Sequence, residues 1–269
     1  MSQPTLHPRI LALETSTERL SLAFLQGEQV CVREIDAGQR HSELAIATLG
    51  ELLAEAKITL ADLDVIAFGQ GPGSFVGVRI ACGLAQGLAL GAGKPLIAVA
   101  TQLALAEQAR ATRSELKRVL VAIDARIGEF YVAAFEVADA EDGDEALEAT
   151  GWLTVVAPML AKANQLPELI GDDWVAIGSA FDVPGLGAQL TARYAGQLHN
   201  IIANRLPSAV DVARIAARQF AKLGDAATIA PEQAAPLYLR NHVAMTIAER
   251  QAAKVLTEVA TEVATKAAA

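Results

Sequence analysis

The pattern of apolar and polar positions at the start of the chain predicts a β-hairpin, then a third strand and a helix. Residues 9–24 read RILALETSTERLSLAF, two apolar runs around a polar turn near residues 15–19, which is typical of a hairpin. A strand is expected over residues 29–35. A helix is expected from Ser42, as its N-cap, to Lys57, because apolar residues then recur at helical spacing. That stripe consists of Ala45, Leu49, Leu52, Leu53 and Ala56.

The same signals place elements along the rest of the chain. Residues 59–62 have the form of a capping box, and Pro207-Ser208 is expected to begin an amphipathic helix that ends at Gly224. A further helix is expected over residues 101–111. Four short buried strands are expected over residues 64–68, 96–100, 119–124 and 174–178. Strands that alternate with helices indicate an α/β fold.

The first hairpin has a counterpart in the middle of the chain. When ILALETSTERLSLAF is laid over LVAIDARIGEFYVAA, the apolar residues coincide through the first strand and into the returning strand. That strand ends in an acid in both copies, Glu14 and Asp124. The shared acid and the shared hairpin favour a chain built from two similar lobes.

The stretch GQGPGSFVGVRIACGLAQGLALG, residues 69–91, raises the question whether its glycines bind phosphate or serve packing. The dinucleotide pattern GxGxxG fails because Ser74 stands at the sixth position, and the Walker pattern fails because Pro95 follows Gly93-Lys94. Two interpretations remain. Ser74 caps a helix whose first N–H groups could attract an anion, or the glycines allow a tight strand-to-helix turn.

Two ridges of small residues follow on the predicted helix. Gly83, Gly87 and Gly91 recur at every fourth position, and Ala81, Ala85 and Ala89 form a second ridge on another side. Each interior glycine costs about 1 kcal/mol of helix stability relative to alanine, so a close approach should offset that loss. The approaching element can belong to the same chain or to a partner protein.

Composition and charge restrict the possible environments and partners. Of the 269 residues, 52% are hydrophobic and 20% charged, which is typical of a folded globular protein. The net charge of −9 repels nucleic acid, so if nucleic acid is a substrate, a partner is expected to hold it. Cys31 and Cys82 form no CxxC pair, and no signal peptide or membrane span is evident. A soluble cytoplasmic protein without a membrane partner is expected.

Candidate catalytic chemistry is sparse. The histidines His7, His41, His199 and His242 are scattered, with no HxxxH or HExxH spacing to hold a metal. No GxSxG nucleophile motif occurs. Glu14 and Asp124 end predicted strands, where ligands gather in α/β sheets, but neither has a second carboxylate beside it. No catalytic residue, cofactor site or metal site is therefore predicted.

Four segments resemble, in order and spacing, the bacterial TsaB family, also called YeaZ. They are ILALETSTERLSLA, GQGPGSFVGVRIACGLAQGLALG, VLVAIDARIGEFY and PLYLRNHVA. The resemblance implies the fold of the actin, sugar-kinase and heat-shock ATPase superfamily: an α/β protein with two RNase-H-like lobes in tandem and mixed sheets flanked by helices. The lobes are expected at residues 1–104 and 105–248, followed by an Ala-rich tail, frayed or disordered, at residues 249–269.

The resemblance also implies a function. TsaB-like proteins take part in placing threonylcarbamoyl on adenosine 37 of tRNAs that read codons starting with A. The chain would be a non-catalytic partner of a TsaD-like paralogue, with a TsaE-like ATPase joining the assembly and tRNA bound only through the complex. A homodimer through the same helices is a further possibility. Neither acid-containing turn carries the glycine of a DxGxT-like phosphate turn, which agrees with a non-catalytic role.

The family's partner contacts map onto the first two helices of this chain. In TsaB-like proteins the helix after GPGSF belongs to the bundle that grips the partner, which favours packing over phosphate binding for the glycines. The expected partner-interface residues are Leu44, Thr48, Phe75, Val78, Arg79, Gly83, Gln86, Gly87 and Leu90. Which ridge faces the partner is left open. Two other functions also stay open, a small-molecule kinase of the same fold and a metalloprotease.

Overall fold

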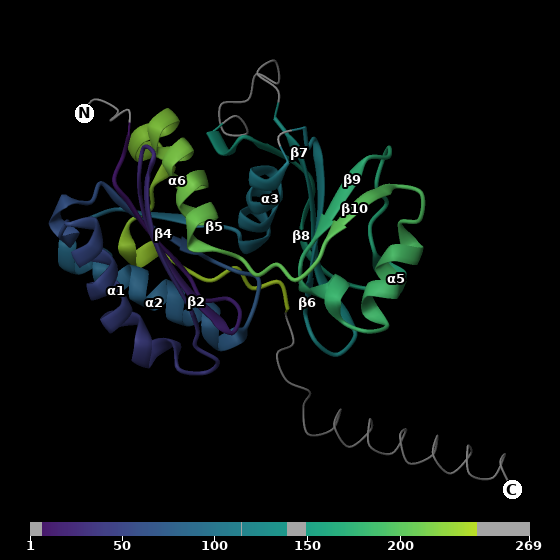
Figure 1. The fold of residues 1–269 in the computed structure, drawn as a ribbon, viewed down its shortest axis with the longest axis horizontal. Helices are drawn as coiled ribbons and strands as arrows, with labels where there is room; N and C mark the ends of the chain where they lie inside the picture. The colour runs from purple at the N-terminus through teal and green to yellow at the C-terminus, as the bar shows by residue number, and fades with distance from the viewer. Residues whose placement is uncertain (1–6, 114, 139–148, 241–269) are drawn as a thin grey trace, which may run out of the picture. The chain divides into compact units, whose positions relative to one another are not determined.

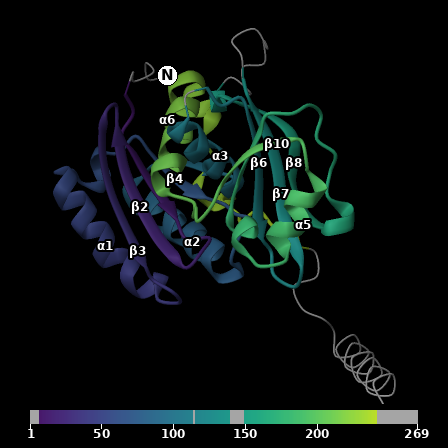
Figure 2. The same cartoon turned by 45° about the vertical axis from the view of Figure 1, so that its right-hand side comes forward.

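The computed structural model describes residues 7–113, 115–138 and 149–240, and shows two five-stranded sheets with helices on their faces (Figures 1 and 2). The strands are β1 (Ile10–Glu14), β2 (Arg19–Gln26), β3 (Gln29–Asp36), β4 (Val65–Gly69), β5 (Leu96–Val99), β6 (Arg118–Asp124), β7 (Glu129–Val137), β8 (Trp152–Lys162), β9 (Trp174–Ile177) and β10 (Leu198–Ile202). The α-helices are α1 (His41–Ala56), α2 (Phe75–Ala92), α3 (Thr101–Thr112), α5 (Leu186–Arg193) and α6 (Ala209–Leu223).

The first sheet has the strand order β3-β2-β1-β4-β5. Strand β1 runs antiparallel to β2 and parallel to β4, which in turn runs parallel to β5. Every residue of β1 is buried. Its alternate side chains enter two separate cores: Leu11 and Leu13 lie on one side, and Ile10 and Ala12 on the other.

The second sheet repeats this topology. Its order is β10-β9-β6-β7-β8, with β6 antiparallel to β7 and parallel to β9. Strand β6 therefore corresponds to β1 in the first sheet, and the acids Glu14 and Asp124 end the corresponding strands. The predicted α/β fold of two similar lobes is confirmed.

Helices cover both faces of the first sheet. Helices α1 and α2 pack on one face through residues such as Leu49, Leu52 and Ala85. Helix α6 packs on the other face through Val212, Ile215 and Ala216, among others. Because α6 follows the second sheet in sequence, the chain returns to the first lobe to complete its core (Figure 1).

Helix α3 precedes the second sheet and packs on one of its faces, through Leu105, Ala106 and Ala109. The opposite face is covered by α5 and the following residues, with Leu190 and Tyr194 buried. The described residues up to Leu239 form one compact unit. The division at residues 104 and 248 stays a proposal, with α6 lying in the range assigned to the second lobe. The Ala-rich tail expected at residues 249–269 lies outside the described residues.

Several predicted helix ends are confirmed. The Ser74 hydroxyl accepts from the N–H of Gly77, and the Ser208 hydroxyl accepts from that of Val210. The capping box at residues 59–62 is present, and Gly224 ends α6 with a positive φ of 57°. The prediction for Ser42 was wrong: α1 begins at His41 with Arg40 as its N-cap and no side-chain cap.

Helix α2 passes a length-and-composition test for a membrane span, among the helices of the described residues. Core helices of soluble proteins pass the same test. In this fold one side of α2 packs on the first sheet, since Ala81, Ala85 and Ala89 are fully buried. Burial against the sheet accounts for this part of its apolar composition.

Candidate functional site

The two ridges of α2 face in opposite directions. Ala81, Ala85 and Ala89 are fully buried, the latter two within the core under the first sheet. The glycine ridge, which we define as Gly83, Gly87 and Gly91, is exposed, and a Cβ added at any of the three would meet no atom within 4 Å. The ridge that the sequence left undecided is thus resolved: alanines pack inward and glycines line a bare outer surface.

Helix α1 lies beside α2 on the same face of the sheet (Figures 1 and 2) and also carries small residues on its outer side. Ala47, Gly50 and Ala54 are exposed there, and Ile46 is 59% exposed. On α2 the exposed apolar side chains are Phe75, Val76 and Leu90, the last of them 65% exposed. We call these exposed sides of the two helices the α1–α2 face.

The nine predicted interface residues separate by exposure. Phe75, Arg79, Gly83, Gly87 and Leu90 are exposed on α2. Leu44 and Gln86 are half-buried, and the Gln86 amide donates to the carbonyls of Pro231 and Ala234, so part of its hydrogen-bonding capacity is used within the chain. These seven residues remain candidates for contact with a partner.

Thr48 and Val78 point into the lobe itself. Both are buried, and the Thr48 hydroxyl donates to the carbonyl of Leu44 at 2.8 Å. The family resemblance implied that both lie at the interface, but in the structure both side chains are buried within the lobe. Neither side chain is available on the α1–α2 face without rearrangement.

Sequence reasoning missed Ile46, Val76 and Tyr238. Val76 directly follows Phe75, and Ile46 lies two residues from both Leu44 and Thr48. An apolar residue outside the buried stripe of each helix was the signal that could have found them. Tyr238 lies in the segment PLYLRN, which resembles the family but for which no interface residue was predicted. Its position beside α2 depends on a long-range contact: the N–H of Leu237 donates to the carbonyl of Gln70 at 2.7 Å.

Arg79 lies between two half-exposed aromatic rings. Its guanidinium carbon is 3.3 Å from the ring centroid of Phe75 and 4.9 Å from that of Tyr238. The two rings are 47% and 49% exposed, with centroids 6.5 Å apart. Its Nη1 donates to the carbonyl of Phe75 at 2.8 Å. We call Phe75, Arg79 and Tyr238 the guanidinium clamp.

Gly69, Gly73 and Gly77, in the loop before α2 and in its first turn, have a different role from the glycine ridge. A Cβ on Gly69 would collide with the Glu14 carboxylate, one on Gly73 with Ser16, and one on Gly77 with the carbonyl oxygen of Thr15. The Ser74 N–H is also engaged within the fold, since it donates to the Ser16 carbonyl at 2.7 Å. The space at this turn is filled by the residues 14–16 of the chain itself, which supports close packing as the reason for these glycines.

The two acids at the ends of β1 and β6 serve their own turns. Glu14 is buried and accepts from the N–H of Ser16 at 2.6 Å and from the Thr101 hydroxyl at 3.0 Å. Burial raises the pKa of Glu14, and these hydrogen bonds offset part of that rise. Asp124 accepts from the N–H of Arg126 at 2.8 Å and pairs with its guanidinium at 3.1 Å. Within the described ranges, no three His, Cys, Asp or Glu side chains gather as metal ligands.

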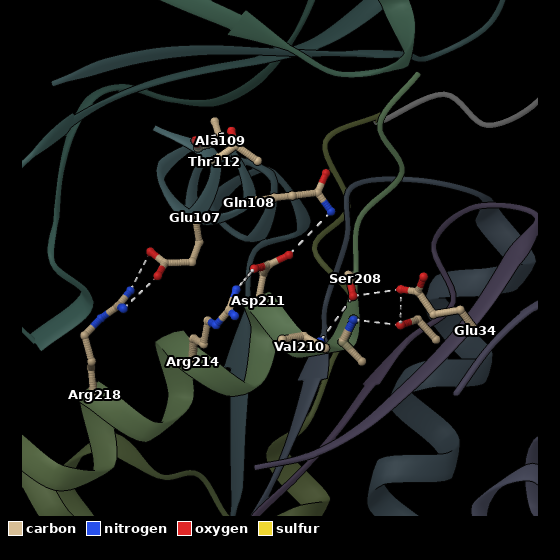
Figure 3. Close-up of polar contacts among 12 residues, drawn as sticks. Glu34, Glu107, Gln108, Ala109, Thr112, Ser208, Val210, Asp211, Arg214 and Arg218 are labelled. Atoms are coloured by element: carbon tan, nitrogen blue, oxygen red, sulfur yellow. Dashed lines mark hydrogen bonds and ion pairs between the residues drawn. The ribbon is translucent and has the colours of Figure 1, made fainter. Parts of the chain in front are cut away.

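A polar cluster joins helices α3 and α6 between the two sheets (Figure 3). Both Nη atoms of Arg218 donate to the Glu107 carboxylate, at 2.8 and 2.7 Å, and the Trp152 indole donates to the same group at 2.9 Å. Burial alone would raise the pKa of Glu107, but Arg218 and Trp152 outweigh it and hold the pKa below its usual value. This ion pair between the buried Glu107 and the partly exposed Arg218 links the lobes.

The first turn of α6 carries a second part of the cluster. Asp211 accepts from Arg214 at 2.9 Å and from the Gln108 amide at 3.4 Å. Burial raises the pKa of Asp211 to about 6, although Arg214 acts to lower it. The Ser208 hydroxyl donates to Glu34 of β3 at 2.8 Å, which ties this turn to the first sheet. None of these contacts was predicted.

Comparisons with known proteins agree with this architecture. The family model for TsaD, described as tRNA N6-adenosine threonylcarbamoyltransferase, matches residues 34–265. The tRNA threonylcarbamoyladenosine biosynthesis protein TsaB of Escherichia coli (strain K12) is 37% identical over 239 residues, 88% of this chain and 96% of that protein. Its namesake in Haemophilus influenzae is 32% identical, over 87% and 94% respectively. The solved structure of YeaZ from Pseudomonas aeruginosa has a TM-score of 0.70 and 29% identity, covering 86% of this chain and 100% of that one.

Proposed function

The chain belongs to the TsaB family of tRNA threonylcarbamoyladenosine biosynthesis proteins, and from that membership we propose that it is a non-catalytic partner subunit of a TsaD-type transferase. It acts in the pathway that its relatives are named for, the formation of threonylcarbamoyladenosine in tRNA. Its part is to bind the TsaD-type paralogue, which transfers the threonylcarbamoyl group to adenosine 37. A TsaE-like ATPase joins this assembly.

The exposed glycine ridge on the α1–α2 face is the main support for the proposal. Helices pack with their axes 8–10 Å apart, and the smallest side chains permit the closest approach. Three glycines in a helix interior, with open space around each, cost stability in the isolated chain. Beside them lie the exposed side chains of Ile46, Val76 and Leu90, and grouped exposed apolar side chains mark interaction sites. A partner helix packed along the ridge offsets the stability cost of the glycines and buries the exposed apolar side chains.

The filled turn before α2 supports the absence of catalysis by this chain. Phosphate loops cradle their ligand with free backbone N–H groups, whereas here Gly73 and Gly77 press against residues 15 and 16. The alternative of a small-molecule kinase is not favoured, because it needs such a cradle and because the relatives are named as biosynthesis proteins of a tRNA modification. The metalloprotease alternative has no support among the described residues, which hold no cluster of metal ligands.

Charge supports an indirect relation to tRNA. A net charge of −9 opposes binding to a phosphate backbone, so tRNA is held by the other subunits of the complex. The α1–α2 face can also receive a second copy of this chain, in competition with the paralogue.

The protein acts in the cytoplasm. Its two cysteines, Cys31 and Cys82, are buried and free, which agrees with a reducing compartment.

Reconstitution of the modification tests this proposal. The TsaD-type paralogue, the TsaE-like ATPase, threonylcarbamoyl-adenylate and tRNA are mixed with and without this chain, and modified adenosine is counted. Product is expected only when the chain is present, and the chain alone is expected to give neither product nor ADP from ATP. Full product without the chain, or ATP turnover at an enzyme-like rate by the chain alone, would contradict the proposal.

A further inference from the structure

We propose that the guanidinium clamp is a preformed site for one carboxylate of the partner, so that Arg79 forms a specific ion pair at the edge of the helix–helix contact. This inference rests on the proposed function and adds to it the chemistry of one partner residue. It also extends the docking surface beyond α1 and α2, because Tyr238 belongs to the chain segment that follows α6.

The first step is that the clamp fixes the guanidinium before any partner arrives. The Phe75 ring lies 3.3 Å from the guanidinium carbon, and the Phe75 carbonyl accepts from Nη1 at 2.8 Å. The Tyr238 ring approaches from a second element at 4.9 Å. Ordering a long side chain on binding costs about 0.5–1.5 kcal/mol, and a side chain already held loses less.

Most hydrogen-bond donors of the Arg79 guanidinium are not used within the clamp. A guanidinium has five N–H donors in its plane, and its faces are weakly hydrated, so stacking leaves the donors free. The Phe75 carbonyl takes one of them. In the described part of the chain, no Asp or Glu oxygen lies within ion-pair distance of Arg79. The geometry that remains matches a carboxylate, which guanidinium binds through two parallel hydrogen bonds.

The third step is that the surroundings favour a protein carboxylate over RNA. Arg79 is the sole charged residue of α2, and the surface beside it is apolar, with Val76, the glycine ridge and Leu90. Phosphate backbones are bound by several cations together, and this chain carries a net charge of −9. A single oriented guanidinium beside an apolar patch fits a protein interface, because arginine and tyrosine are enriched among the residues that dominate binding there.

Affinity for the purified TsaD-type paralogue tests the inference, with the full chain as wild type, R79K and R79Q. R79Q is expected to bind about 30-fold more weakly, the loss typical of an interface hot spot. R79K keeps the charge but loses the planar donors and the stacking, so a loss of about tenfold is expected. Affinity of the wild type should fall with added salt more steeply than that of R79Q. Thermal unfolding of each variant shows whether the fold is intact.

A double-mutant cycle separates the clamp from simple apolar contact. Tyr238→Leu removes the ring and is expected to weaken binding severalfold in the wild type but hardly at all in R79Q, because the ring acts through Arg79. Equal effects of Tyr238→Leu in both backgrounds would overturn the inference. So would wild-type affinity of a folded R79Q variant.

The controls keep this inference apart from the proposed function. If R79Q binds the paralogue normally while Gly87→Leu does not, the clamp inference fails and the proposed function stands. If the wild type does not bind the paralogue at all, the proposed function itself fails. An R79Q variant that loses only self-association, or only retention of tRNA, would show a second copy or RNA as the occupant and would also overturn the inference.

Discussion

At the scale of residues, the glycines of residues 69–91 do two different things. Gly69, Gly73 and Gly77 lie where any side chain would collide with residues 14–16, whereas Gly83, Gly87 and Gly91 lie in the open. Both sets repeat at every fourth position, so spacing in the sequence does not distinguish them. The difference arises because α2 begins at Phe75 and turns its later glycines outward.

This difference predicts opposite effects of the same substitution. Gly77→Ala should destabilise the fold by about 2 kcal/mol or more, because the added methyl group meets the backbone carbonyl of Thr15. Gly83→Ala should stabilise it by about 0.5–1 kcal/mol, because alanine is the better helix former and nothing lies within 4 Å. Urea unfolding of the two variants measures both effects. Equal changes in both variants would contradict the assignment of the two sets.

At the scale of elements, most strands and helices could be predicted from periodicity, but their packing partners could not. The apolar stripe of α6 predicts which face of this helix is buried. It does not predict the sheet on which the helix packs, because the two sheets have the same topology and each has apolar faces. The choice of the first sheet depends on long-range contacts such as Ser208 with Glu34 and Ala209 with Ser21. Local patterns contain no information on such contacts. The same limit applies to Tyr238 and the guanidinium clamp.

The first turn of α6 should also make stability depend on pH through Asp211. The pKa of Asp211 is about 6 in the folded chain against 3.8 in the reference state, so the folded state holds this proton more tightly. Its contribution is therefore fully present below pH 4 and is lost as pH rises toward 6. Relative to Asp211→Asn, the wild type should lose on the order of 1–3 kcal/mol over this range, since each unit of pKa corresponds to about 1.4 kcal/mol.

Urea unfolding of both proteins at several pH values between 4 and 7 measures this difference. Asparagine keeps an oxygen for the Gln108 amide and has no charge to bury, which makes it the matched reference. A stability difference between the two proteins that does not change with pH would show that Asp211 titrates in the folded chain as it does in the unfolded one.

At the scale of the whole molecule, the duplicated topology was predictable from the hairpin shared by residues 10–24 and 120–134, but the connection between the lobes was not. Helices α3 and α6 meet through the ion pair of the buried Glu107 and the partly exposed Arg218 (Figure 3). Removing the arginine leaves the buried Glu107 carboxylate without its partner. Arg218→Ala should therefore destabilise the chain by about 1–3 kcal/mol, less than the loss of a fully buried pair because solvent screens the arginine.

The pair of Arg33 and Glu55, whose carboxylate is 46% exposed, provides the matched control for this prediction. Arg33→Ala should cost less than about 1 kcal/mol, because water solvates the remaining carboxylate. Chemical unfolding followed by tryptophan fluorescence reports on both variants, since Trp152 donates to Glu107. Equal and small losses in the two variants would mean that the contact between α3 and α6 contributes little to the cohesion of the lobes.

The central claim, that the glycine ridge receives the paralogue, is tested most directly by calorimetric titration of the full chain with the TsaD-type protein. Gly87→Leu places a large side chain into the open space of the ridge, and Ala188→Leu places the same side chain on the exposed side of α5 as a control. At least about tenfold weaker binding is expected for Gly87→Leu, because overpacking a filled contact costs on the order of 1–3 kcal/mol. Its stability should equal that of the wild type or exceed it by up to about 1 kcal/mol, since glycine is the poorer helix former, and Ala188→Leu should bind as the wild type does. Wild-type affinity of a folded Gly87→Leu variant would contradict the claim.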